Sequence, residues 1–288
     1  MIKLSIIIPH YNSVSSLIKL LNSIPHLEWI EIIVIDDNSD EDIFNLKSNY
    51  KNVFFYKLDN NRKGAGAARN VGIHYSIGEF LLFADADDYF LKGAFDIIRT
   101  YLDSENDIVF FNPTSLNLLT NKIGIRHNKY AIIIQKYLTF KNKEILYKFH
   151  VPWSKLISSK FIKDKKIRFE EIISSNDVNF SLKSIFYANR ITCTLDQIYC
   201  VTESSNSLTN TFTEEVLDSR FDAACRYNDF LQIKGFKNLQ TAMSGHLWNT
   251  RFFGFYKFLY RFFYCKYKKY PFFYDFKHLL SVFRHYKN

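Results

Sequence analysis

The chain has 288 residues, of which 47% are hydrophobic, and its formal net charge at pH 7 is +9. This length and apolar content provide one substantial core with an appended subdomain, and the 9 glycines and 5 prolines exclude long disordered tracts. The 4 cysteines lack zinc-ligand spacing, so we expect free thiols in a reducing cytosol. No uncharged apolar stretch reaches the roughly 18 residues that span a bilayer, and the N-terminus lacks a signal-peptide layout.

Apolar strands and polar turns alternate through the first third of the chain. We expect four buried strands, at residues 5–8, 30–35, 53–58 and 79–84. Each is followed by a polar turn, and after the first strand Ser13 begins a helix whose leucines recur at helical spacing. Consecutive βα units imply a parallel sheet with right-handed crossovers, and the polar turns then share the carboxyl edge, where such sheets bind ligands.

The turn Asp85-Ala86-Asp87-Asp88 places three carboxylates directly after the fourth strand. Crowded carboxylates raise one another's pKa unless a cation neutralises them, and their oxygens suit Mg²⁺ or Mn²⁺ that also binds phosphate. The turn therefore predicts a divalent metal that holds a nucleotide diphosphate. The alternative is an Asp-rich cap on a helix that starts near Leu91, because aspartate is favoured at helix starts.

Beyond these units the pattern is weaker. We expect a strand at 107–113, a hairpin at 115–126, one or two strands returning to the sheet at 191–201, and a helix at 213–233 that is capped by Thr213. Residues 128–165 mix short helices with loops and are expected to shape a pocket.

Four motifs occur in order within residues 3–92: Ser-Ile-Ile-Ile-Pro-x-Tyr-Asn, Ile-Asp-Asp-Asn-Ser-Asp, Lys-Gly-x-x-x-Ala-Arg-Asn-x-Gly and Gly-Glu-Phe-x-x-Phe-x-Asp-Ala-Asp-Asp. Together they resemble glycosyltransferase family 2. The resemblance implies the α/β GT-A fold of nucleotide-diphospho-sugar transferases, with a mostly parallel central sheet flanked by helices. A dinucleotide-binding site is excluded because the glycines at 64–66 follow the third strand, not the first. Sugar-phosphate nucleotidyltransferases are excluded because residues 9–12 contain no glycine.

The resemblance implies a nucleotide-sugar donor site formed by Pro9, Tyr11, Asp37, Lys63, Arg69, Asp85 and Asp87. Pro9 and Tyr11 would lie against the base, and Asp37 would accept a hydrogen bond from a base N–H. The neighbouring Asp36 is expected to be a solvated helix cap, because adjacent residues at a strand end point to opposite faces.

Lys63 and Arg69 would face the base or the diphosphate, where cationic donors match anionic oxygens. The alternative for both is an exposed charge at a helix start. Asp85 would contact the ribose or the metal region, and Asp87 would be the metal ligand, for Mn²⁺ or Mg²⁺. The role of Asp88 is left open.

The same resemblance assigns the catalytic base to Asp177, which follows a Trp-x-Lys element at 153–155 and Phe169-Glu170-Glu171. Family members usually have Glu-Asp where this chain has Asn176-Asp177, and the loss of a like charge should lower the pKa of Asp177. The alternative is that Asp177 only caps the helix at 178–187, and Glu170 and Glu171 are held in reserve as bases. Trp153 would stack on an acceptor sugar, or else pack in the core.

We expect a catalytic domain at 1–212, divided into a nucleotide-sugar-binding half (1–112) and an acceptor-binding half (113–212), and a helical region at 213–288. Residues 251–288 hold nine Lys or Arg, one acid and 17 aromatic side chains. Such a segment is typical of one that lies on an anionic membrane surface. It would also fit single-stranded nucleic acid, which we do not expect, or a helix whose aromatic stripe packs on the catalytic domain while its lysines are solvated.

The sequence therefore predicts an inverting, metal-dependent glycosyltransferase. It would move a hexosyl or N-acetylhexosaminyl group from a UDP-sugar onto a hydroxyl of a growing glycan, lipid-linked or free, of the capsule, O-antigen or lipooligosaccharide type. The enzyme would be cytoplasmic and peripheral at the inner face of the cell membrane. The contrasting hypothesis is a non-catalytic nucleotide-sugar-binding or membrane scaffold protein on the same fold, which the intact acids at 85, 87 and 177 disfavour.

Overall fold

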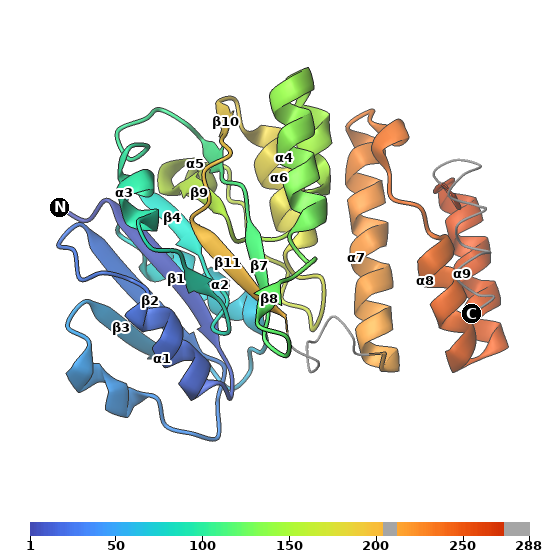
Figure 1. Ribbon diagram of the computed structural model, residues 1–288. Coiled ribbons are helices and arrows are strands. Elements are labelled where there is room, and N and C mark those ends of the chain that lie inside the picture. The colour runs from blue at the N-terminus through green and yellow to red at the C-terminus, as the bar shows by residue number, and fades with distance from the viewer. Residues whose placement is uncertain (204–211, 274–288) are drawn as a thin grey trace.

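The computed structural model describes residues 1–203 and 212–273 (Figure 1). A central sheet has seven strands in the order β10 (Ile191–Cys193), β6 (Ile108–Phe110), β9 (Lys155–Ser158), β4 (Phe80–Phe83), β1 (Leu4–His10), β2 (Ile30–Asp36) and β3 (Val53–Lys57). A second sheet has four, in the order β5 (Tyr89–Phe90), β11 (Tyr199–Glu203), β7 (Thr114–Asn117) and β8 (Lys122–Ile123).

Helices surround these sheets. The α-helices are α1 (Val14–Asn22), α2 (Ala65–Tyr75), α3 (Ala94–Arg99), α4 (Asn128–Phe140), α5 (Ser159–Asp164), α6 (Val178–Tyr187), α7 (Glu214–Ile233), α8 (Ser244–Thr250) and α9 (Phe255–Lys268). Short 3₁₀ helices are η1 (Phe44–Asn49), η2 (Lys143–Lys148), η4 (Lys237–Leu239) and η5 (Arg251–Phe253). No helix within 1–203 or 212–273 is long and apolar enough to cross a bilayer.

The four predicted strands are β1 to β4, and they pair in parallel as expected. Pro9 is tolerated inside β1 because the pairing of β1 with β4 ends at Ile7. On the β4 side of β1, Ile7 C=O accepts from Ala84 N–H. Backbone groups face the same side at every second residue, so the next group on this side belongs to Pro9. Proline has no N–H to donate, and β4 is no longer paired at that position. The mainly parallel α/β class is confirmed, and the carboxyl ends of β1, β2 and β4 meet at one edge.

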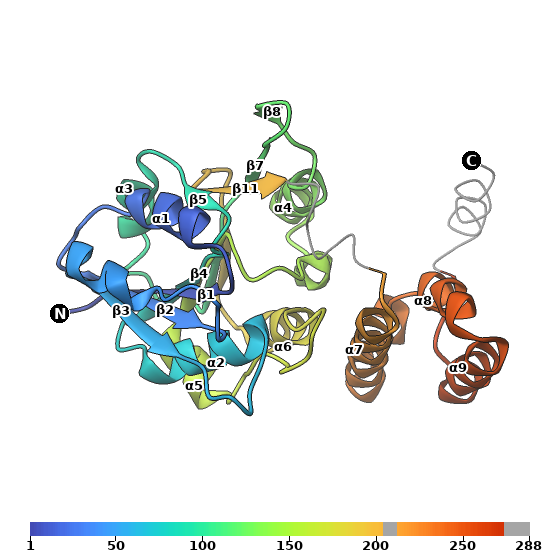
Figure 2. The same cartoon turned by 90° about the horizontal axis from the view of Figure 1, so that it is seen from below.

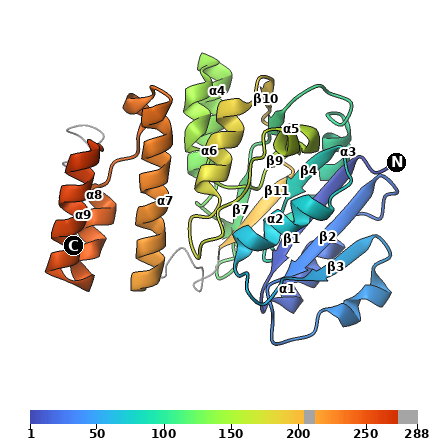
Figure 3. The same cartoon turned by 180° about the vertical axis from the view of Figure 1, so that it is seen from behind.

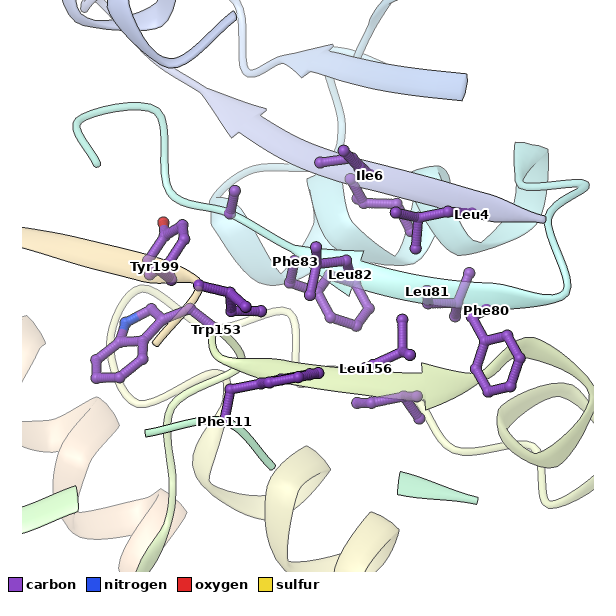
Figure 4. Close-up of a cluster of buried hydrophobic side chains, with 14 of the residues drawn as sticks. Leu4, Ile6, Phe80, Leu81, Leu82, Phe83, Phe111, Trp153, Leu156 and Tyr199 are labelled. Carbon is purple, nitrogen blue, oxygen red and sulfur yellow. The ribbon is translucent and has the colours of Figure 1, made fainter. Parts of the chain in front are cut away.

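Two layers of helices cover the central sheet, with α1 and α3 on one face and α2 and α5 on the other (Figure 2). Seen from behind, α2 lies over the strands β1 and β2 (Figure 3). The core between the layers is built from near-continuous apolar strands such as Ile6, Ile7 and Ile8, which are fully buried (Figure 4 shows the neighbouring β4).

Three expectations about elements need correction. The 155–158 segment is a strand, β9, which runs antiparallel between β4 and β6 in the central sheet. The predicted return at 191–201 gives two strands in different sheets, β10 and β11. The helix expected near Leu91 begins at Ala94, has no side-chain cap, and is separated from the Asp85–Asp88 turn by β5, so that turn does not cap it.

The helices α7, α8 and α9 form a separate apolar cluster, which includes Phe221, Met243, Leu247, Cys265 and Tyr270. The cap of α7 at Thr213 is as predicted, since its hydroxyl accepts from Val216 N–H at 3.4 Å. The four cysteines are free and buried. Residues 274–288 of the predicted helical region lie outside the described residues.

Candidate active site

The candidate site is built on the turns after β1, β2 and β4, and its first element is a buried His–Asp pair. His10 Nδ1 lies 2.9 Å from Asp36 Oδ1, and His10 Nε2 accepts from Ser13 N–H at 3.2 Å. Because Nε2 accepts, the proton is on Nδ1 and is donated to the carboxylate. Ser39 also donates to Asp36, from its hydroxyl at 2.6 Å and its N–H at 3.1 Å. Asp36 is only 3% exposed, so its expected role as a solvated cap is wrong.

The pair fixes the loop that carries Tyr11, so replacing His10 should weaken donor binding. His10→Phe keeps a planar ring but leaves Ser13 N–H and Asp36 Oδ1 without the imidazole, and a lost buried partner costs about 1–3 kcal/mol. We expect a lower unfolding midpoint and a several-fold weaker affinity for UDP by calorimetry. The control is His74→Phe, at an exposed histidine of α2. Equal UDP affinity in the two variants would show that His10 does not position the loop.

The residues expected to contact the nucleotide base lie on these turns. Pro9 is buried at the end of β1, and Tyr11 follows it with 57% of its surface exposed. Asp37 Oδ2 accepts from Gly64 N–H at 2.8 Å, whereas Asp37 Oδ1 is buried without a hydrogen-bond partner among the described residues. Burial raises the pKa of Asp37, while Gly64 N–H and the nearby Lys63 oppose that rise. An unpartnered acceptor here is what recognition of a base N–H requires.

The start of α2 explains the glycines in the third motif. Gly64 has a φ of 91°, a conformation that favours glycine, and it turns the chain into the helix. A Cβ at Gly66 would lie 2.1 Å from the carbonyl oxygen of Glu170 and 3.0 Å from Asn176 Cβ. The glycine thus lets α2 approach the 170–176 loop, which leads directly into Asp177.

Gly66→Ala should therefore both destabilise the protein and reduce activity. The backbone carbonyl cannot move aside as a flexible side chain would, so overpacking should cost about 1–3 kcal/mol. The control is Gly245→Ala in α8, where a Cβ meets nothing within 4 Å and helix propensity favours alanine. Denaturant unfolding of the two variants checks this, and equal midpoints would contradict the close approach.

Arg69 connects the turn that contains Asp85 to Asn176, the residue before the predicted catalytic base. It is 5% exposed, which rules out the alternative of an exposed charge, whereas Lys63 is exposed. Its Nη2 donates to Asp85 Oδ1 at 2.6 Å and its Nη1 donates to Asn176 Oδ1 at 2.8 Å. Its Nε is buried and has no hydrogen-bond partner in the described part of the chain. Asn176, which replaces the usual glutamate, thus serves as an acceptor for the guanidinium.

The three aspartates after β4 have different surroundings. Asp88 is 3% exposed and accepts from Tyr199 Oη at 2.9 Å and Thr202 N–H at 2.7 Å, so it fastens the turn to β11. Burial raises the pKa of Asp88 well above its usual range. The Tyr199 hydroxyl in turn accepts from Asp85 N–H at 2.8 Å. Asp88 is therefore structural, and Asp85 is held by its neighbours on both sides.

Asp87 is the carboxylate best suited to a metal. Within 1–203 and 212–273 no hydrogen bond or ion pair joins its carboxylate to another residue, only its own backbone N–H acts on it, and its backbone C=O accepts from Thr202 Oγ1 at 2.8 Å. Desolvation and the neighbouring Asp85 raise the pKa of Asp87, while Arg126 opposes the rise. The described residues contain no cluster of three or more potential metal ligands. A Mg²⁺ or Mn²⁺ that binds through one or two carboxylates and completes its shell with phosphate and water would still fit.

Asp177 occupies the N-cap position of α6, but its side chain makes no cap hydrogen bond, so the alternative that it serves only as a helix cap is not supported. Burial raises the pKa of Asp177, Asp85 adds to the rise, and Arg69 and Lys155 oppose it. We expected a lowered pKa from the loss of a neighbouring carboxylate, and desolvation overrides that effect. A raised pKa suits a group that must accept a proton and release it.

The reserve bases are already paired. Glu170 accepts from Arg226 at 2.6 Å and from Asn179 at 2.9 Å. Glu171 forms an ion pair with Arg62 and accepts from Asn70 at 3.1 Å. Because both glutamates are already paired, Asp177 is the carboxylate on this side of the site with the fewest side-chain partners among the described residues.

Trp153 is a core residue, and the prediction that it stacks on an acceptor sugar is wrong. It is 1% exposed, and its ring lies 5.0 Å from that of Tyr130 and 6.2 Å from that of Tyr199 (Figure 4). Lys155, two residues on, is also buried, and its Nζ donates to Phe149 C=O at 2.8 Å. Desolvation lowers the pKa of Lys155 to about 7, with Asp177 opposing.

Sequence reasoning missed Tyr199, Arg126 and Lys129. Tyr199 lies more than a hundred residues from the aspartates it contacts, and no motif marks it. Arg126 follows the β7–β8 hairpin and donates to Thr202 C=O at 3.4 Å, beside the Asp87 turn. Lys129 opens α4 within electrostatic range of Asp177. Arg126 and Lys129 could have been identified from the sequence, because the anionic oxygens expected at the Asp85–Asp88 turn need cationic partners.

The chain is similar to known proteins. The sequence model of the family described as "Glycosyl transferase family 2" matches residues 5–164. The chain is 30% identical over 208 residues to the poly(ribitol-phosphate) beta-N-acetylglucosaminyltransferase TarS of Staphylococcus aureus, covering 69% of this chain and 35% of TarS. It is 33% identical over 111 residues to the GalNAc(5)-diNAcBac-PP-undecaprenol beta-1,3-glucosyltransferase of Campylobacter jejuni, covering 36% of this chain and 35% of that protein. The chain spans about a third of the length of these relatives.

Solved structures share the fold. The crystal structure of S. aureus TarS 1-349 in complex with UDP matches with a TM-score of 0.62 and 25% identity, over 83% of this chain and 70% of that one. A structure of the same segment in complex with UDP-GlcNAc matches with a TM-score of 0.62 and 23% identity, over 86% and 72%. In TarS, therefore, a fold like this one binds UDP and UDP-GlcNAc.

Proposed function

The chain belongs to glycosyl transferase family 2, and from that membership and its site we propose that it is an inverting, metal-dependent glycosyltransferase. The observation that supports this most directly is the Arg69 bridge. Two nitrogens of one buried guanidinium join Asp85, on the donor turn, to Asn176, which adjoins Asp177. The bridge brings the group that would receive the acceptor proton close to the turn that would hold the diphosphate.

In the proposed donor complex, Asp37 Oδ1 accepts from a base N–H and Tyr11 covers the base. The unpartnered Arg69 Nε–H faces anionic oxygen. Asp87, with Asp85 beside it, would hold Mg²⁺ or Mn²⁺, and the ion would supply Lewis-acid stabilisation of the diphosphate. Lys63, near Asp37, and Arg126, near Asp87, add cationic donors to the site.

For transfer, Asp177 takes the proton of the acceptor hydroxyl as its oxygen attacks the anomeric carbon. The new glycosidic C–O bond forms as the bond to the nucleoside diphosphate breaks on the opposite face, so the anomeric configuration inverts. The electron pair of the broken bond leaves with the diphosphate, whose charge Arg69 and Lys63 stabilise. Burial favours this step because the ionised Asp177 gains a proton and loses its desolvation cost.

We propose UDP as the nucleotide and a cell-surface glycan as the acceptor, of the capsule, O-antigen or lipooligosaccharide type. Support comes from the names of the relatives, one of which is a poly(ribitol-phosphate) beta-N-acetylglucosaminyltransferase and the other a glucosyltransferase named for a PP-undecaprenol compound. An acceptor of the second kind is lipid-linked, so we also propose that the enzyme works at the cytoplasmic face of the membrane.

Incubation of the protein with a panel of nucleotide sugars and Mn²⁺, followed by mass spectrometry, tests the catalytic proposal. We expect one UDP-sugar to be hydrolysed slowly without acceptor, and hydrolysis to stop on chelation. A protein that binds UDP but releases no sugar from any donor, with or without glycan extracts, would instead be the non-catalytic nucleotide-sugar-binding protein.

A further inference from the structure

Four aromatic side chains line the outer face of α9, and we call them the aromatic stripe: Tyr256, Tyr260, Phe263 and Tyr267. Their spacing of four, three and four residues places them on one side of the helix. Each has between 59 and 87% of its surface exposed. The stripe extends over about 16 Å at the helical rise. Figures 1 and 2 show α9 at the end of the molecule opposite β3, with α7 and α8 on its inner side.

The inner face of α9 carries three of the cations that the sequence suggested would face lipid. Lys257 Nζ lies 2.6 Å from both Glu214 and Asp218, and Arg261 Nη2 lies 2.8 Å from Asp218. Lys268 Nζ lies 3.1 Å from Asp229. All three acids belong to α7. These pairs orient α9, so its aromatic stripe is turned outward rather than packed on the catalytic domain.

Exposed positive charge remains at the C-terminal end of the stripe. Lys266 and Lys269 are exposed and form no ion pair within the described residues. Residues 251–273 contain no Asp or Glu at all. Two copies of this face would therefore bring cations together with no acid between them, and a second copy of this chain is a poor partner for it.

The chemistry of the stripe favours lipid over nucleic acid. Its members are rings only, three of them with a hydroxyl, and such amphipathic rings prefer the headgroup depth of a bilayer. A single strand would need cations spaced along the rings to follow its phosphates. Here the exposed cations lie at one end, and those along the middle of the helix are engaged by α7.

We propose that the aromatic stripe, with Lys266 and Lys269, is the surface by which this protein lies on an anionic phospholipid membrane. The helix would lie parallel to the bilayer plane, its rings at headgroup depth and its two lysines at lipid phosphates. The inference deepens the membrane location given under the proposed function, but lipid binding by this surface does not depend on catalysis.

Flotation of the full chain with vesicles tests the surface. We expect binding to phosphatidylcholine vesicles that contain phosphatidylglycerol, weaker binding without it, and loss at high salt. Tyr260→Ser with Phe263→Ser should reduce the bound fraction at least about fivefold. The matched control is Leu119→Ser with Phe140→Ser, two exposed apolar residues of the catalytic domain.

A second pair isolates the charge contribution. Lys266→Gln with Lys269→Gln should reduce binding only to the anionic vesicles, whereas Lys160→Gln with Lys165→Gln, at exposed lysines near α5, should not. Hydrolysis of a nucleotide sugar is measured in every preparation. Active variants that lose flotation support the membrane surface, and inactive wild type that still floats would count against the catalytic proposal alone.

Three results would overturn the inference. One is wild-type protein that fails to float with either vesicle, and another is stripe variants that float as well as the control. The third is a stripe that binds oligonucleotides, or a concentration-dependent dimer that the stripe variants abolish, without any vesicle binding.

Discussion

Asp177→Asn is expected to lower the transfer rate by about 10²- to 10⁴-fold while leaving the affinity for UDP nearly unchanged. The amide keeps the size of the side chain but cannot take the acceptor proton. Because Asp177 makes no cap hydrogen bond to α6, the substitution should also leave stability close to that of the wild type. Kinetics and calorimetry with UDP check the two halves of this expectation. The control, Asp164→Asn at the exposed last residue of α5, should be fully active.

The same assignment predicts the pH dependence. Asp177 must be ionised to accept a proton, and its pKa is raised by burial, so activity should be lost as pH falls through that raised value. The acidic limb of the rate profile should therefore lie at higher pH than for an ordinary aspartate. Lys155 is protonated there, because its pKa is about 7, and it opposes the rise. Lys155→Met should thus move the limb further upward. Near wild-type turnover in Asp177→Asn would refute the assignment.

Asp87→Ala is expected to weaken UDP binding about tenfold, or about 1.4 kcal/mol, in the presence of Mn²⁺. Removing the carboxylate removes the group that best fits the ion, since Asp85 is shared with Arg69 and Asp88 is bound by Tyr199 and Thr202. Chelation of the wild type should produce the same loss. Titration of UDP by calorimetry, with and without chelator, measures both effects.

The decisive comparison combines the Asp87→Ala substitution with chelation. If Asp87 holds the ion, chelation should have little further effect on Asp87→Ala, whereas Asp164→Ala should respond to chelation as the wild type does. Wild-type affinity that is the same before and after chelation would remove the metal from the proposed mechanism. The cationic donors Arg69, Lys63 and Arg126 would then have to stabilise the diphosphate alone.

Local pattern was sufficient for the four parallel strands within the first ninety residues. Apolar runs and polar turns predicted β1 to β4, because buried parallel strands have near-continuous hydrophobic sequences. The strand β9 was missed because four residues, Lys-Leu-Ile-Ser, give no periodicity, and its place is set by pairing with β4 and β6. For Trp153 the sequence left stacking on a sugar and packing in the core both open, since only the packed fold shows which face of that segment is enclosed.

The site was predictable in its residues and less so in their roles. Motifs identified Asp85, Arg69 and Asp177, but the Arg69 bridge to Asn176 spans 107 positions and depends on the close approach at Gly66. The sign of the Asp177 pKa shift was wrong because a neighbouring charge can be counted in a sequence, whereas burial cannot. Asp36 was misassigned because its partner, His10, lies on another strand.

The ion pairs between α7 and α9 constrain how this chain can vary. From its composition, the basic and aromatic end resembles a module that evolution could exchange freely. Glu214, Asp218 and Asp229 depend on it, however, because without Lys257, Arg261 and Lys268 three carboxylates of α7 would be left without their counterions. We therefore expect α9 and α7 to be inherited together. Related sequences that reverse the charge at position 218 should carry compensating reversals at positions 257 and 261.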